Sequence, residues 1–320
     1  MYGPGMEPVQ TRYSISSVFL QCITEEILKN GRRNSVGDAL RFGFFLYLCS
    51  MKTREVIEWL DATFKPEYQE DYDNSGFLFG DARSDYRGAL VALDLTPAVV
   101  DEAVRTGASL IVTHHPFIFT GVKRMTDGSA TGRMVMTLAK NDIAVYAAHT
   151  NLDNLPWGVS GVLAAKLGLK GCKVLSVKSD AEGGADGAVG AGMVGMFEEP
   201  MPLEAFLKRV KEVTGIPFVR VAPLATDHWP QATVQRVALC GGSGAEFIGD
   251  AMRAGADIYL TADLKYHDFQ RTDGRMVLAD IGHYESEQFA KEIIFRAISE
   301  KFSNFACRIS DMQQGIVSYI

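Results

Sequence analysis

Cysteine and positive charge are both in short supply in this 320-residue chain. The five cysteines are widely spaced and form no C-x-x-C pair. This fits neither a disulfide framework nor a zinc ribbon, and indicates unpaired thiols in a reducing compartment such as the cytoplasm. The 39 Asp and Glu residues outnumber 32 Lys and Arg, for a net charge of −7. Nucleic-acid binding normally needs a basic face that displaces counterions, so this balance argues against a nucleic-acid partner.

Long apolar runs are scarce as well. The apolar stretch from Phe42 to Cys49 is about eight residues long, whereas a helix that spans a bilayer needs about 20. A leader of about forty residues in front of it is too long for a signal peptide. We therefore expect no membrane association.

The length and composition favour two globular domains. Domains average about 150 residues, and the chain has the ordinary globular balance of 47% hydrophobic and 22% charged residues. We expect residues 51–170 to form a first α/β module and residues 171–320 a second. The stretch 179–192, rich in Gly, Ala and Asp, is expected to be a loop or linker.

Residues 1–50 differ from the rest because no clean amphipathic period runs through them. From Met51 the pattern becomes that of an amphipathic helix, with Val56, Leu60 and Phe64 on one face. We expect Met51 to be the true start and residues 1–50 to be an over-extended reading frame. The alternative is a poorly ordered N-terminal extension.

From Met51 onward, predicted strands alternate with helices of about ten residues. The strands are predicted at 88–95, 109–113, 143–147, 192–197, 218–221, 234–239, 258–261 and 276–281. The helices are predicted at 51–64, 97–106, 131–141, 160–167, 203–214, 245–254 and 285–302. This order predicts an α/β fold with two modules of largely parallel sheets flanked by helices. Such sheets bind ligands at the carboxyl ends of their strands, so we expect the functional site there, between the modules.

Two adjacent histidines, His114 and His115, follow the predicted strand 109–113. Pro116 keeps His115 out of helical geometry, so both imidazoles lie in a loop at a strand end. A lone histidine is usually structural, but two at a strand exit are equally consistent with metal ligation.

The next predicted strand is followed by the segment HTNLD at 149–153. The carboxylate of Asp153 can bridge two cations, and His149 can ligate a metal or orient another ligand. The alternative is an Asx turn with a helix cap, which this segment alone would favour.

The third segment, at 282–287, follows the predicted strand 276–281 and opens the last long helix. His283 and Glu287 are four residues apart, so on a helix they lie on one face about one turn apart. The same spacing places the two histidines of the zinc motif H-E-x-x-H, although an H-x-x-x-E pattern alone is weak evidence.

The three segments together supply three imidazoles and two carboxylates at the ends of predicted parallel strands. A tetrahedral ion takes at most about four protein ligands, so five candidates suggest two divalent ions per chain. Nitrogen and oxygen ligands without a thiolate suit Zn, Mn, Fe, Co or Ni, and the residues do not choose among these metals. The five candidate ligands are His114, His115, Asp153, His283 and Glu287.

Seven segments also carry a resemblance to a known family. They are YDNSG at 72–76, DLT at 94–96, THHPFIF at 113–119, HTNLD at 149–153, CGGSG at 240–244, ADLKYHD at 262–268 and DIGHYESE at 280–287. In this order and spacing, the chain from Met51 to its end resembles the Nif-three-like family, the GTP cyclohydrolase 1 type 2 homologues, which are described as hexameric dinuclear-metal-centre proteins. The resemblance implies that the same five residues ligate the metals. It also implies a homohexamer, a toroid whose inner cavity holds the metal sites.

The chain departs from the family pattern at positions that are not ligands. Tyr72 stands where the family has Trp, and the stretch 76–80 is less polar than in the family. The large central domain that long members insert is missing or reduced here, so any role of that domain is in doubt for this chain.

Two glycine-rich segments and two basic side chains remain. Residues 190–195 match G-x-G-x-x-G, but they lie in a predicted strand and open no helix, which argues against a dinucleotide site. The turn at 240–244 either binds an anion such as a phosphate through its N–H groups or is a tight β–α turn near the metals. Lys265 and His267 either meet the substrate or a metal-bound water, or have ordinary surface roles.

These features favour a dinuclear-metal hydrolase that acts on a small phosphorylated or nucleotide-like molecule. Two ions about 3.5–4 Å apart lower the pKa of a bridging water and polarise the bond under attack. The family label implies a hydrolytic ring opening, although no residue here reads purine specifically. The alternative is a non-catalytic or regulatory protein that stores, delivers or senses the ions. Tightly held ions with no vacant coordination position would favour that alternative.

Overall fold

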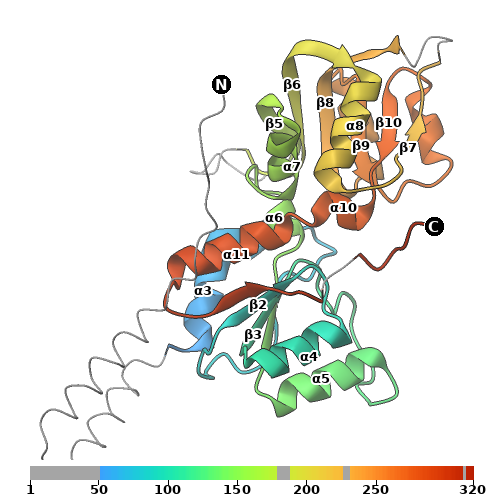
Figure 1. Cartoon of the computed structure of the whole chain (residues 1–320). Coiled ribbons are helices and arrows are strands. Elements are labelled where there is room, and N and C mark those ends of the chain that lie inside the picture. Colours follow the sequence, from blue (N-terminus) through green and yellow to red (C-terminus); the bar gives the residue numbers. More distant parts are fainter. Residues whose placement is uncertain (1–50, 179–187, 226–230, 313–314) are drawn as a thin grey trace, which may run out of the picture.

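The structure is a computed structural model that describes residues 51–178, 188–225, 231–312 and 315–320. The expected N-terminal extension, 1–50, and most of the expected linker at 179–192 lie outside the described residues. The described chain forms two sheets, each flanked by helices (Figure 1). The predicted α/β fold class is confirmed.

The first sheet has five strands in the order β1-β4-β3-β2-β11. They are β1 (Gly76–Phe79), β2 (Ala89–Ala92), β3 (Leu110–Thr113), β4 (Ala144–Ala147) and β11 (Cys307–Ile309). Strands β4, β3, β2 and β11 run parallel, and β1 is an antiparallel edge. Every residue of β2, β3 and β4 is buried, as expected for parallel strands that are covered on both faces.

Helices cover both faces of the first sheet (Figure 1). One face carries α4 (Pro97–Thr106) and α5 (Ala130–Lys140), and the other carries α3 (Thr53–Phe64) and α11 (Ala290–Lys301). Local sequence sets such bounds. The hydroxyl of Thr96 accepts the N–H of Val99 at the start of α4, and Gly107 ends this helix in the left-handed conformation.

The second sheet has six strands in the order β5-β6-β8-β9-β10-β7. They are β5 (Lys170–Val177), β6 (Gly190–Pro202), β7 (Arg220–Ala222), β8 (Thr233–Ser243), β9 (Ile258–Ala262) and β10 (Val277–Asp280). Helices α7 (Val159–Leu167) and α8 (Leu203–Thr214) cover one face, and α9 (Ile248–Arg253) covers the other. Within the described ranges, the connections contain the short 3-10 helices η1 (Pro66–Tyr68), η3 (Ala245–Phe247) and η4 (Asp268–Thr272).

The second sheet is mixed, whereas the sequence predicts largely parallel pairing. Strands β8, β9 and β10 are parallel, as predicted. Strand β6 is antiparallel to both of its neighbours, and the edge strand β7 is antiparallel to β10. The predicted last helix, 285–302, is two helices, α10 (His283–Glu287) and α11, which are separated at Gln288 and Phe289.

The chain passes between the two sheets at two short helices, α6 (Thr150–Asp153) and α10. Figure 1 shows both at the junction of the sheets. Helix α7, which follows α6, packs on the second sheet, and β11, which follows α11, pairs in the first. The expected module boundary therefore differs from the sheets in two places. Helix α7 belongs to the expected module 51–170 but packs on the second sheet, and β11 belongs to the expected module 171–320 but pairs in the first sheet. Among the described residues, every helix is too short or too polar to cross a membrane.

Candidate metal centre

His114 and His115 leave the end of β3 in the loop that the sequence predicts. Their backbone N–H groups donate to the carbonyl of Leu93 at 3.1 and 2.9 Å, which fixes the loop against the end of β2. The buried His114 ring places Nδ1 2.7 Å from the carbonyl oxygen of Ala148. The Nδ1 of His115 lies 2.7 Å from Oδ1 of Asp94. Both rings therefore direct Nε2 away from these acceptors.

His149 is the N-cap of the short helix α6, and Asp153 is the last residue of that helix, shortly after β4. The Nδ1 of His149 lies 2.7 Å from Oδ1 of Asp73. Asp73 also accepts the backbone N–H of Thr150 at 3.1 Å, so it caps α6 from a distant loop. Asp153 faces His114 instead, with 3.6 Å between its Oδ1 and the Nε2 of the ring.

His283 and Glu287 lie one turn apart on α10, as their spacing predicts. The Nε2 of His283 is 2.9 Å from Oε2 of Glu287, and its Nδ1 is 2.7 Å from Oδ2 of Asp263. Gly242 makes room for the carboxylate of Glu287. Its φ is +64°, and a Cβ at this position would lie 1.9 Å from Oε1 of Glu287. Glycine is therefore required here for Glu287 to reach the cluster.

The ligand atoms converge on Oε2 of Glu287. This atom lies 2.8 Å from Nε2 of His115, 2.9 Å from that of His283 and 3.8 Å from that of His114. The Nε2 atoms of His115 and His283 are 3.3 Å apart. Three sets of three ligand atoms, each set within 4.8 Å, could hold a metal ion: His114, His115 and His149; His115, His283 and Glu287; His114, Asp153 and Glu287.

The tautomers of the four rings suit a metal. Burial acts to raise the pKa of Asp73 and Asp94, but hydrogen bonds from their histidines outweigh it and lower both. The hydrogen bond from His283 likewise lowers the pKa of Asp263. An ionised carboxylate or a carbonyl can only accept, so each Nδ1 carries a hydrogen and each Nε2 faces the cluster, where a metal ion can take the place of its proton. Metal-ligating histidines have this arrangement.

Two buried atoms of the cluster provide a direct test of fit. The Nε2 of His114 and the Oδ1 of Asp153 have no hydrogen-bond partner among the described residues. A buried polar atom left in this state costs about 1–3 kcal/mol. A divalent cation between the two atoms would satisfy both, because a neutral imidazole and a carboxylate are metal ligands. The residues present therefore fit a divalent metal.

The carboxylates of the cluster favour a positive charge between them, either a proton on an imidazole or a metal ion. Burial acts to lower the pKa of His115 and His283, but hydrogen bonds to carboxylates raise these values to about 9 and about 11. Burial acts to raise the pKa of Glu287, yet the imidazoles hold it well below its usual range. Burial raises the pKa of Asp153 to about 7, against the opposing effect of His114. Protons and metal ions therefore compete for the same Nε2 and carboxylate atoms.

The structure brings the five predicted ligands together and places beside them His149, for which the sequence left open whether it ligates a metal or orients another ligand. That they ligate a metal stays a prediction. Sequence reasoning assigned no role to the carboxylates that hold the rings, Asp73, Asp94 and Asp263. For Asp94 a signal exists, because it lies at the end of a predicted strand as the candidate ligands do.

The other candidate segments, 240–244 and the pair Lys265 and His267, do not contribute ligand atoms to the cluster. The expected turn at 240–244 is instead the end of β8, which continues to Ser243. There the N–H of Gly241 donates to Ser160 Oγ at 3.1 Å, and that of Gly242 to Ser286 Oγ at 2.9 Å. These N–H groups are used within the protein, so the segment serves close packing near the cluster. Lys265 and His267 are exposed, and neither is among the described residues that line the cavities next to the cluster.

Fold and cluster together define an α/β protein with a histidine and carboxylate site that could bind a metal ion. The profile of the family described as Duf34/NIF3 (NGG1p interacting factor 3) matches residues 51–315. The chain belongs to this family, which confirms the resemblance seen in its motifs.

Individual relatives support the same family assignment. A Clostridium perfringens protein is 33% identical over 74% of this chain and 87% of its own length. A Streptomyces coelicolor protein is 37% identical over 73% of this chain and 80% of its own length. Both are named "GTP cyclohydrolase 1 type 2 homolog". The crystal structure of a hypothetical protein from Staphylococcus aureus matches with a TM-score of 0.74 and 28% identity, and the match covers 85% of this chain and 100% of that one.

Proposed function

We propose that this chain is a metal-dependent hydrolase that holds two divalent ions in its histidine and carboxylate cluster. The observation that carries the proposal is the position of Oε2 of Glu287, within 3.8 Å of the Nε2 atoms of three histidines. Two of the three ligand sets share Glu287. One tetrahedral ion cannot use all of these atoms, so two ions that share a carboxylate account for them better than one ion does.

Two of the sets would hold the two ions: His114, Asp153 and Glu287 would hold one, and His115, His283 and Glu287 would hold the other. Glu287 rather than Asp153 would then be the residue that both sets share. The ring centroid of His149 lies 5.3 Å from that of His114 and 5.5 Å from that of His115, which supports a role as a further ligand. Nitrogen and oxygen ligands without a thiolate suit Zn, Mn, Fe, Co or Ni.

When bound, two such ions would supply an activated water and would polarise the bond under attack. The chain's own residues orient the site, because Asp94 and Asp263 hold the Nδ1 hydrogens of His115 and His283 and keep both rings from turning. The relatives' name, GTP cyclohydrolase 1 type 2 homolog, supports a hydrolytic reaction. We assign to this chain a small phosphorylated or nucleotide-like substrate.

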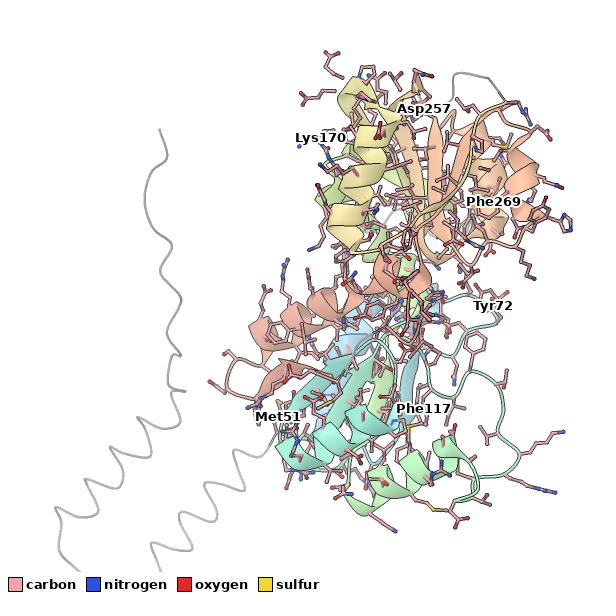
Figure 2. The ribbon with its side chains drawn as sticks, turned by 45° about the vertical axis from the view of Figure 1, so that its right-hand side comes forward. Met51, Tyr72, Phe117, Lys170, Asp257 and Phe269 are labelled. Atoms are coloured by element: carbon pink, nitrogen blue, oxygen red, sulfur yellow. The ribbon has the colours of Figure 1, made fainter. Side chains whose placement is uncertain are left out.

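Assembly into a homohexameric toroid is part of the proposal. Tyr72 and Phe119 are 62% and 45% exposed, and their ring centroids are 6.4 Å apart. Figure 2 shows Tyr72 at the level of the junction between the sheets. Exposed aromatic side chains near the ligand loops are typical of surfaces that pack against another subunit. A closed ring would admit small substrates to the cluster and keep folded proteins and duplex nucleic acid out.

A cytoplasmic location is also part of the proposal. Cys172, Cys240 and Cys307 are free thiols. Free thiols persist in a reducing compartment, which supports this location.

Elemental analysis of the purified protein, paired with a hydrolysis screen of nucleotides and phosphate esters, tests the proposal. We expect about two divalent ions per chain and turnover that a chelator abolishes and added metal restores. Asp153→Ala should lose metal, whereas Asp101→Ala, at an exposed aspartate on α4, should not. A wild-type protein that stays metal-free after reconstitution with Zn or Mn would refute the proposal. Two bound ions without turnover would favour the metal-handling alternative.

A further inference from the structure

Two cavities reach the histidine cluster, and His283 lines both of them. The larger, of about 730 Å³, also reaches His115. The smaller, of about 220 Å³, also reaches His149, Asp153 and Glu287. These two cavities, both lined by described residues, differ in size and in chemistry.

The smaller cavity does not suit an organic substrate. Cavities that bind small molecules have volumes of about 300–1,000 Å³, and this one has about 220 Å³. Its described lining residues include the carboxylates of Glu70, Asp153 and Glu246 and no Lys or Arg. It therefore favours water or a cation over an anionic molecule.

The larger cavity has the size and the walls for a molecule that contains a ring. Its wall includes aliphatic and aromatic side chains: Leu93, Leu264, Tyr284, Ile316, Val317 and Tyr319. A flat ring gains most from such walls, because its faces leave water and its edge meets aromatic side chains.

Three of the four carboxylates in the same wall are each engaged by a neighbour: Asp94 by His115, Asp263 by His283 and Asp280 by Arg220. Their negative charge is therefore partly compensated. The wall as a whole repels an anion less than four isolated carboxylates would.

Arg220 is the one Lys or Arg among the described residues that line the larger cavity. Its Nη2 donates to the carboxylate of Asp280 and, at 2.5 Å, to the carbonyl of Leu264. Its Cζ lies 5.3 Å from the ring centroid of Phe269, which Figure 2 shows at the edge of the second sheet. Its Nε and Nη1 make no hydrogen bond within the described part of the chain. The guanidinium is therefore held in place with donors left for a ligand, which lowers the entropic cost of binding.

We propose that the larger cavity binds the organic part of the substrate and that Arg220 binds an anionic group on it. The ligand is then a small anion that contains a ring, and another part of it reaches His115 and His283. The part of this inference that places the reaction at His115 and His283 rests on the proposed function. The part that has Arg220 bind an anionic group is independent of it.

Three probes test this inference on the metal-loaded full chain. Naphthalene-2-sulfonate has a ring and an anionic group that binds metals weakly, 2-naphthalenemethanol has the ring alone, and methanesulfonate has the anionic group alone. We expect naphthalene-2-sulfonate to bind most tightly of the three when Kd is measured by fluorescence and calorimetry. Arg220→Met keeps an unbranched side chain and removes the charge. It should raise the Kd of naphthalene-2-sulfonate about tenfold and change that of the alcohol less than about twofold.

Two further variants make the test specific. Arg253→Met removes an exposed arginine that also pairs with an aspartate, Asp250, but lies outside the cavity lining, so it should leave binding unchanged. Val317→Asp adds a negative charge to the wall at a side chain that is 64% exposed, and it leaves the pair of Arg220 and Asp280 intact. It should weaken the sulfonate more than the alcohol. If Arg220→Met does not fold, Val317→Asp decides the matter.

The inference is wrong if the cavity variants bind the sulfonate as tightly as wild type, or if Arg253→Met weakens binding as much as Arg220→Met does. Metal content measured on the same samples separates this result from the proposed function. Two bound ions without binding that depends on Arg220 overturn only the inference. Binding that depends on Arg220 in a chain that takes up no metal supports the inference and overturns the proposed function.

Discussion

Replacing Gly242 with alanine should displace the carboxylate of Glu287 and release metal from the cluster. A Cβ at this position would lie 1.9 Å from Oε1 and 2.8 Å from Cδ of Glu287, whereas real Cβ contacts essentially never fall below 3.0 Å. The carboxylate must therefore retreat by about 1 Å. Metal–ligand distances tolerate deviations of only about 0.2 Å. Because Glu287 belongs to two of the three ligand sets, its displacement should affect both ions.

Gly255→Ala is a matched control for the backbone. Gly242 has φ +64° and Gly255 has φ +66°, but a Cβ at Gly255 meets nothing within 4 Å. In the left-handed conformation a non-glycine residue costs roughly 1–2 kcal/mol. Both variants carry this cost, so the difference between them isolates the contact with Glu287.

The assay is denaturant unfolding of the metal-free proteins, followed by elemental analysis after reconstitution with Zn. Gly255→Ala should lose roughly 1–2 kcal/mol of unfolding free energy and keep its metal. Gly242→Ala should lose more free energy than the control, and most of its metal. If Gly242→Ala binds as much metal as wild type, the reasoning that places Glu287 among the ligands is refuted.

Three more predictions follow from the cluster and its surroundings. Asp263→Ala should weaken metal affinity about 10–100-fold in chelator competition because His283 loses the acceptor for Nδ1. Asp273→Ala is the control and should leave metal affinity unchanged, because Asp273 (φ 50°) has the same left-handed backbone as Asp263 (φ 56°). Metal binding near pH 7 should release protons and strengthen as the pH rises, because the pKa values of His115 and His283 are about 9 and about 11. Calorimetry in two buffers of different ionisation enthalpy measures this release, and equal heats would contradict it. Light scattering should give the mass of six 35.0 kDa chains, and a monomer with metal bound would overturn the ring.

The strands of the first sheet show what sequence patterns can predict. Strands β2, β3 and β4 are continuous apolar runs because helices cover both of their faces, so composition alone marks them. Strand β5 escapes prediction because it lies at a sheet edge and most of its side chains are not buried. Strand β11 has three residues, too few for any period, and it exists only because β2 offers an unpaired edge.

The candidate site divides in the same way. His114, His115 and Asp153 are predictable because each lies just past a strand of a parallel sheet, and parallel strands end at a common edge. The carboxylate that holds His149 is not predictable by that rule. Asp73 is 76 positions away in the sequence and meets the ring only because the fold brings their two loops together. The shared position of Glu287 likewise depends on the crossing helix α10, which no local pattern places opposite β3.

The number of divalent ions per chain, compared between wild type and Glu287→Gln, tests the central claim most directly. Glutamine keeps the shape of the side chain and removes the charge that both ligand sets share. We predict about two ions per chain in the reconstituted wild type and fewer than about one in the variant, since an uncharged amide is a poor bridge between two cations. One ion per chain in the wild type, unchanged in Glu287→Gln, would contradict a dinuclear site built on Glu287.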